Sequence, residues 1–179
     1  MPSSRIDQAL AQKGGPVYES ACARCHELDG ELVGQVTPLA DIGTDPERLR
    51  SFTAELADRM NTIGTGTPWK FSHFRKTEGY ANMPLDGVWL NAPYLHNGSV
   101  PTLSDLLEPP ASRPARFWRG YDVYDQAKLG FVSDVPEADG QVFSRYDTSV
   151  PGNGNTGHVY GTTLPDDDKR AIVEYLKTF

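Results

Sequence analysis

The stretch Cys22-Ala23-Arg24-Cys25-His26 contains both cysteines of the 179-residue chain, and a histidine follows the second one directly. On a single helical turn the two thiols would lie on one side, next to the imidazole. A disulfide between such close residues would close a very tight loop and would stabilise the chain little. The cysteines are therefore better interpreted as attachment points than as a crosslink.

This spacing is the attachment signature of c-type haem. Thiols on one turn can reach both vinyl groups of a porphyrin, and the adjacent imidazole then lies under the iron. We predict one covalently bound haem c (iron), attached through Cys22 and Cys25, with His26 as an axial ligand. A zinc site would need a second ligand pair at tight spacing, which the sequence lacks, and a thiol redox pair would lack its usual parallel-sheet setting.

The composition favours one domain with a cofactor in its core. A length of 179 residues lies within the usual range, so we predict that residues 1–179 form a single cytochrome c domain. The apolar fraction is only 38%, and 17 Gly with 14 Pro predict much turn and loop. A bulky apolar cofactor would supply the missing core.

The charge balance and the hydropathy restrict partners and location. With 17 Lys and Arg against 24 Asp and Glu, the acidic surface would repel phosphate backbones and anionic lipid, so nucleic acid is not expected as a partner. No apolar run is long enough to span a bilayer, and residues 1–15 lack a secretory apolar region. Because haem is attached to such motifs outside the cytoplasm, we expect a periplasmic or secreted protein whose leader has been removed or which is part of a longer chain.

Helix signals predict a mainly α, cytochrome c-type helical fold around one haem, with long Pro/Gly-rich wrapping loops. The expected helices comprise one ending at Gly14 and Gly15, one opening at Pro16, an amphipathic helix at 44–63, a short helix at 103–107 and a closing helix at 165–178. Residues 111–161 are too rich in Gly, Pro, Asp and Asn for an ordinary connection. They predict either short strands or a wrap around the cofactor.

The second axial ligand has several candidates, because thioether and imidazole are both common at haem iron. They are Met60, Met83, His73, His96 and His158. Met60 lies on the apolar stripe of a predicted helix and is interpreted as core. Met83 precedes a proline in a loop, a common setting for an axial methionine, whereas His73 lies in an aromatic and basic stretch typical of a solvated loop.

The segment APYLHNGSVPTL at residues 92–103 resembles the C-terminal haem domain of the bacterial di-haem cytochrome c peroxidase family. The match is closer still to the haem-dependent rubber oxygenase branch, where it extends through residues 84–89, 146–153 and 157–158 and the closing helix. The resemblance implies that His158 occupies the position of the distal ligand, with Met83 as the alternative. It also implies that His96 forms a hydrogen bond near the haem edge and fixes its loop.

Basic and aromatic side chains offer further contacts to a haem. The candidates for pairing with propionates are Arg75, Lys76, Arg113, Arg116 and Arg119. The tryptophans that could pack on a porphyrin are Trp69, Trp89 and Trp118.

One departure from the family decides the expected function. Its members have two haem sites, whereas this chain has one attachment motif, so the catalytic half is missing. With histidine on both sides the iron has no free position, which favours electron transfer to or from a redox partner protein. We predict a periplasmic mono-haem cytochrome, or the haem domain through which electrons enter a larger oxidase or peroxidase, and assign no catalytic residue. The alternatives are a peroxidase or oxygenase with an open or displaceable distal position, and a haem-based sensor or docking module that uses the aromatic loop at 117–143.

Overall fold

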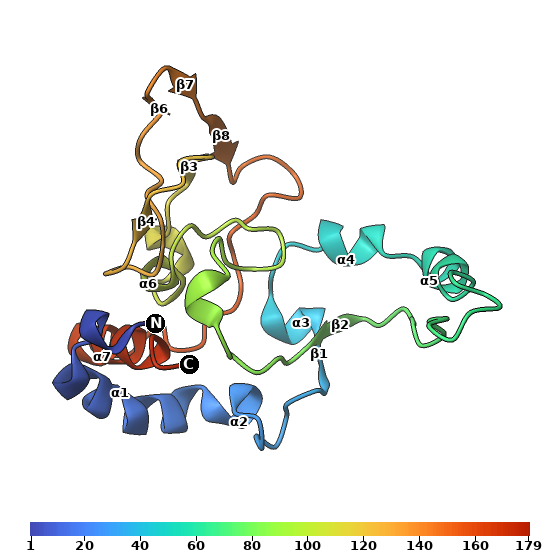
Figure 1. Cartoon of the computed structure of the whole chain (residues 1–179), viewed down its shortest axis with the longest axis horizontal. Coiled ribbons are helices and arrows are strands. Elements are labelled where there is room, and N and C mark those ends of the chain that lie inside the picture. Colours follow the sequence, from blue (N-terminus) through green and yellow to red (C-terminus); the bar gives the residue numbers. More distant parts are fainter.

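The computed structural model describes residues 1–179. Helices α1 (Gln8–Ala21) and α7 (Asp166–Leu176) lie side by side, with both chain termini at this end of the molecule (Figure 1). Asp7 caps α1 by accepting a hydrogen bond from the Leu10 amide at 3.0 Å. The closing helix is confirmed.

Helix α1 runs without a break through Gly14, Gly15 and Pro16, so the expected division into two helices is wrong. A Cβ atom at Gly14 would lie 2.1 Å from the carbonyl oxygen of Ala171 in α7. The glycine therefore allows close helix packing, and this tertiary contact outweighs the local stop signal.

The haem motif follows directly. Helix α2 (Ala23–His26) begins after Cys22, and strand β1 (Val36–Pro38) then pairs antiparallel with β2 (Gly79–Ala81). Helix α3 (Leu39–Ile42) leads from this ribbon toward the segment 47–78, which we call the arm.

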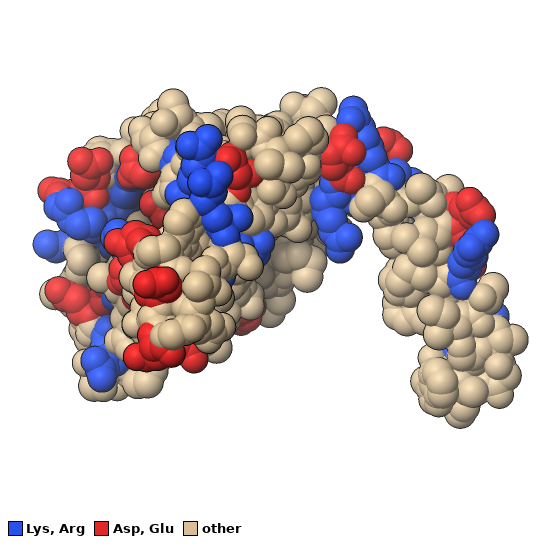
Figure 2. All heavy atoms as spheres, turned by 90° about the horizontal axis from the view of Figure 1, so that it is seen from above, with Lys and Arg blue, Asp and Glu red and all other residues tan.

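The arm carries α4 (Glu47–Ser51) and α5 (Ala54–Met60) away from the body of the molecule (Figures 1 and 2). The single amphipathic helix expected at 44–63 is therefore wrong. Thr53 interrupts it by capping α5, since its hydroxyl accepts a hydrogen bond from the Leu56 amide at 3.1 Å. The apolar stripe is buried only in part: Leu49 is buried, whereas Leu56 is 40% exposed and Ile63 is 58% exposed.

The middle of the chain returns to the body through short elements. Helix α6 (Leu103–Leu106) is confirmed, and Thr102 caps it by accepting from the Asp105 amide at 3.0 Å.

The remaining elements of the chain are short. The 3₁₀ helices are η1 (Ser3–Arg5), η2 (Val88–Leu90) and η3 (Pro110–Ser112). The antiparallel pairs are β3 (Arg116–Arg119) with β8 (Ser144–Asp147), β4 (Tyr124–Asp125) with β5 (Gly130–Phe131), and β6 (Glu137–Ala138) with β7 (Gln141–Val142).

The expected mainly α fold is wrong. Helices contain 32% of the residues and strands 14%, and the strands form only two-stranded ribbons. The physical reason lies in residues 111–161, where closely spaced Gly and Pro end each element after a few residues. Of the two structures expected there, short strands are observed.

The core joins α1, α6 and α7 to the segment before α6. Its most buried side chains are Tyr18, Val100, Leu129 and Ile172. No helix combines the length and apolar character needed to cross a membrane.

Candidate haem site

The structure brings His26 and His158 together from distant parts of the sequence. Their ring centroids are 6.2 Å apart, with 45° between the ring planes. Two imidazoles on opposite sides of one metal ion, each with a metal–nitrogen bond of about 2 Å, have centroids about 6 Å apart. The spacing of this pair therefore fits an iron with two histidine ligands.

The two cysteines lie at the junction of α1 and α2, and both are free and partly buried. The Cys22 amide donates to the Tyr18 carbonyl at 2.8 Å, and the Cys25 and His26 amides both donate to the Cys22 carbonyl at 3.1 Å. The motif thus forms the single turn that its spacing predicted. Burial, together with the neighbouring Cys25, raises the pKa of the Cys22 thiol to about 11, so the free thiol keeps its proton.

His26 is oriented by a main-chain carbonyl. Its Nδ1 donates to the Met83 carbonyl oxygen at 2.7 Å, and because a carbonyl only accepts, the proton resides on Nδ1. This leaves the Nε2 lone pair for a metal, an arrangement common among histidine ligands. The Met83 carbonyl thus orients His26, whereas the Met83 side chain is 63% exposed. This arrangement favours His158 over Met83 as the second ligand.

His158 lies in a strained loop directly before the final helix. Its φ is +43°, a left-handed conformation that non-glycine residues rarely adopt. The preceding Gly157 lies so close to Gly43 that a Cβ atom would approach the Gly43 carbonyl carbon to 2.3 Å. The His158 amide also donates to the Ile42 carbonyl at 2.7 Å. Tight packing against residues 42–43 therefore fixes this loop.

The imidazole of His158 is suited to metal binding. Burial, reinforced by His26, lowers its pKa to about 4, so the ring is neutral at neutral pH. Its Nδ1 is buried and has no hydrogen-bond partner in the protein. A neutral imidazole with an unpartnered nitrogen is consistent with a ligand to a group that the protein itself does not supply.

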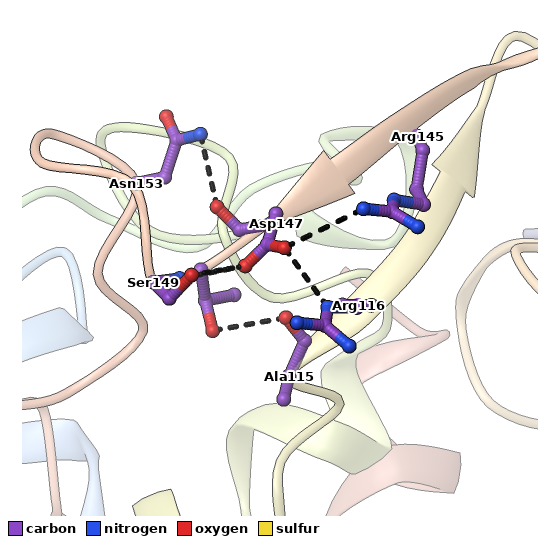
Figure 3. A network of polar contacts seen from close by, with 7 residues as sticks. Ala115, Arg116, Arg145, Asp147, Ser149 and Asn153 are labelled. Atoms are coloured by element: carbon purple, nitrogen blue, oxygen red, sulfur yellow. Dashed lines mark hydrogen bonds and ion pairs between the residues drawn. The ribbon is translucent and has the colours of Figure 1, made fainter.

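A polar network around Asp147 fixes the turn that leads into this loop (Figure 3). The Asp147 carboxylate accepts from the Ser149 hydroxyl at 2.6 Å and from Arg116 Nε at 2.9 Å, while Asn153 donates to the Asp147 carbonyl at 3.1 Å. The hydrogen bonds from Ser149, then that from Arg116, hold the pKa of Asp147 well below its usual range. This network accounts for the 146–153 segment, which the sequence singled out only by resemblance.

His96 holds a neighbouring loop in place. Its Nε2 donates to the Asp45 carbonyl at 3.0 Å, and its ring stacks on Tyr80 with centroids 4.4 Å apart. The adjacent Asn97 amide donates to the carbonyls of Gly152 and Gly154 at 3.1 and 2.9 Å. These contacts agree with the loop-fixing role that the resemblance implies for His96.

The other sequence candidates lie elsewhere or have protein partners. Met60 and the exposed His73 belong to the arm, far from α2 (Figure 1). Trp89 donates from Nε1 to the Phe179 carbonyl at 2.8 Å. The arginines 116 and 119 contact Asp147 and the Tyr146 ring, respectively.

Two supports of the site were not assigned that role from the sequence. One is the Met83 carbonyl that orients His26, and the other is the buried Arg113 guanidinium, which donates only to main-chain carbonyls. Every residue has a main-chain carbonyl, so no sequence motif indicates which carbonyl acts as an acceptor. The left-handed conformation of His158 could not be predicted from the sequence either, although the preceding Gly157 weakly indicated an unusual backbone there.

The donor set fits haem better than a bare metal ion. Nowhere in the chain do three or more His, Cys, Asp or Glu side chains converge as a protein-only metal site requires. Two facing imidazoles and a nearby pair of thiols match the two kinds of bond that a c-type haem makes, one to iron and one to the porphyrin edge.

Comparisons with known proteins point in the same direction. Residues 9–68 match the family model for cytochrome c oxidase, cbb3-type, subunit III, and residues 79–119 match the RoxA-like, cytochrome c-like model. Two uncharacterised proteins of Sinorhizobium fredii are similar. Protein y4iJ is 45% identical over 108 residues, covering 55% of this chain and 17% of y4iJ. Protein y4iM is 32% identical over 217 residues, covering 97% of this chain and 49% of y4iM. The chain thus spans at most about half the length of these relatives.

Proposed function

We propose that this chain, whose family-model matches support a cytochrome c haem domain, transfers single electrons through one haem c. Cys22 and Cys25 would bind the porphyrin, and His26 and His158 would be the axial ligands. The observation that carries this proposal is the 6.2 Å spacing of the two imidazole rings. When bound, the haem supplies the one-electron couple.

Two histidine ligands leave no open position for peroxide or oxygen. The His26 ring is held by the hydrogen bond of its Nδ1, and the His158 backbone is held by the hydrogen bond of its amide. Little therefore has to move when the charge of the site changes by one. Imidazole in place of methionine also lowers the reduction potential, because an axial methionine raises it. These features suit a carrier of electrons at modest potential better than a catalyst.

The natural setting of the domain is part of the proposal. We place it in the periplasm or outside the cell, where haem attachment to such motifs occurs, with a redox protein as its partner. The RoxA-like match over residues 79–119 supports a relation to the rubber oxygenase branch of the di-haem peroxidase family. Because the chain covers 49% of y4iM, a role as the haem domain through which electrons enter a larger oxidase or peroxidase is part of the same proposal.

The optical spectrum of the purified protein tests this function. We expect a low-spin c-type spectrum in the ferric and reduced states, no near-infrared methionine-to-iron band, and no change when carbon monoxide is added to the reduced protein. If the methionine band appears, Met83 and not His158 is the second ligand, and the electron-transfer role stands. A high-spin spectrum that shifts with carbon monoxide would overturn that role in favour of a peroxidase or oxygenase.

A further inference from the structure

Arg113 is a buried arginine whose hydrogen-bonding capacity is fully used. Its side chain is 4% exposed. A guanidinium has five N–H donors, and here each one reaches a main-chain carbonyl. The acceptors are the carbonyls of Glu108 (3.0 Å from Nε), Asn155 and Gly157 (2.7 and 2.8 Å from Nη1), and Leu106 and His158 (both 3.1 Å from Nη2).

No carboxylate balances this charge. Arg113 takes part in none of the ion pairs of the chain, and burial lowers its pKa. Burying a cation among neutral groups is costly, and only well-aligned dipoles offset that cost. A neutral side chain of the same size would pack here more cheaply, so the arrangement indicates a requirement for the five fixed hydrogen bonds.

The five acceptors connect two parts of the molecule. Three belong to the loop at 155–158, and two belong to the end of α6, which packs on α7. Opposite Arg113, the same loop is fixed by the His158 amide, which donates to the Ile42 carbonyl. The His158 backbone is thus held through its own carbonyl by Arg113 and through its own amide by residue 42.

We propose that Arg113 is a positioning residue for His158: its guanidinium holds the left-handed loop so that the imidazole faces His26 across the iron. This inference rests on the proposed function, because it presupposes that His158 is an axial ligand. It assigns to Arg113 a role that differs from pairing with a haem propionate. The buried charge also lies close enough to His158 to favour the reduced state of the site, so its removal lowers the reduction potential.

The test compares R113Q, R113K and R59Q in the haem-loaded protein. R113Q removes the charge and most donors, whereas R113K keeps the charge but has a different donor geometry. R59Q is the matched control, because Arg59 is an exposed arginine of α5 that pairs only with Glu55, away from the His158 loop. The readouts are the spin state, the rate of carbon monoxide binding to the reduced protein and the reduction potential.

We expect wild type and R59Q to remain low-spin and inert to carbon monoxide. Reduced R113Q should bind carbon monoxide, because the loss of a residue that supports a metal ligand weakens ligation about 10- to 100-fold. Free imidazole should restore the low-spin spectrum. R113K should show an increased rate with a potential near that of wild type, and R113Q a lower potential.

Three results would overturn the inference in distinguishable ways. Folded R113Q and R113K with the rates and spectra of wild type would show that Arg113 does not position His158, while leaving the proposed function intact. If neither variant yields folded haem-loaded protein although R59Q does, Arg113 has a role in folding alone. Wild-type protein that already binds carbon monoxide as fast as R113Q would overturn the proposed function itself, and the inference with it.

Discussion

The two histidines of the site are held in opposite ways. His26 lies on a short helix that continues a long, well-packed one, beside both cysteines, and a single hydrogen bond to the Met83 carbonyl orients its ring. His158 lies in a strained loop with no regular structure, and contacts from residues 42–43 and from a buried arginine that also binds the end of α6 hold it. The first ligand depends on local structure and the second on contacts between distant segments.

This difference predicts how each half responds to change. Covalent attachment and a continuous helix keep His26 near the haem even if distant contacts loosen. The His158 loop has no such protection, because each of its contacts comes from a separate part of the chain. Mutations outside the motif should therefore affect ligation by His158 before they affect haem retention.

The largest effect is expected at the cysteines. Replacing Cys22 and Cys25 together by Ala removes both attachment points, so we expect haem retention to be lost on a denaturing gel stained for haem, whereas either single variant keeps one bond and retains part of the haem. His96→Ala serves as the control and should retain haem fully, because His96 makes no attachment. Unchanged retention in the double variant would refute covalent attachment.

His158→Ala should open the second axial position without releasing the haem. We expect a high-spin ferric spectrum and rapid binding of carbon monoxide to the reduced protein, both reversed by free imidazole. His96→Ala should stay low-spin, because that ring is held by the Asp45 carbonyl and Tyr80. A low-spin H158A protein that ignores carbon monoxide would require another ligand, and Met83→Leu would then show whether it is methionine.

The same contrast explains what could be predicted from sequence. The Cys22–His26 turn, the closing helix and α6 follow from local spacing and capping, and the structure contains them. The unbroken α1 could not be foreseen, because the contact that stabilises it lies between Gly14 and Ala171.

The expectation of a single helix at 44–63 failed for a related reason. Helical periodicity at 44–63 indicated a buried stripe, but the arm leaves Ile63 exposed and Thr53 caps a second helix. His158 was suggested by resemblance alone. The residue that holds it, Arg113, was considered only as one of several propionate partners, because a guanidinium bound to carbonyls has no pattern in sequence.

A matched pair of glycines in α1 tests the rigidity of the His26 half. Gly14→Ala should lower the free energy of unfolding by about 1–3 kcal/mol, because its Cβ would meet the α7 backbone. Gly15→Ala meets only the Tyr175 ring, at 3.6 Å, and should raise it by up to about 1 kcal/mol through helix propensity. Chemical denaturation measures both, and equal values would contradict the tight α1–α7 contact. In folded G14A we expect the low-spin spectrum to persist.

The smallest effect concerns acid and the turn before His158. Because hydrogen bonds from Ser149 and Arg116 depress the pKa of Asp147 in the folded state, its carboxylate contributes stability above the unfolded pKa of about 4, and that contribution is lost as pH falls through the folded pKa. Asp147→Asn should therefore lower the Tm at pH 7, and its difference from wild type should shrink below about pH 4. Asp134→Asn, an exposed position outside the network, should show no such dependence.

Carbon monoxide binding followed through the same pH range then relates the turn to the ligand. Binding that accelerates in D147N at pH 7 but not in D134N would show that the network of Figure 3 contributes to holding His158. Equal rates would show that Arg113 and the contacts at residues 42–43 suffice.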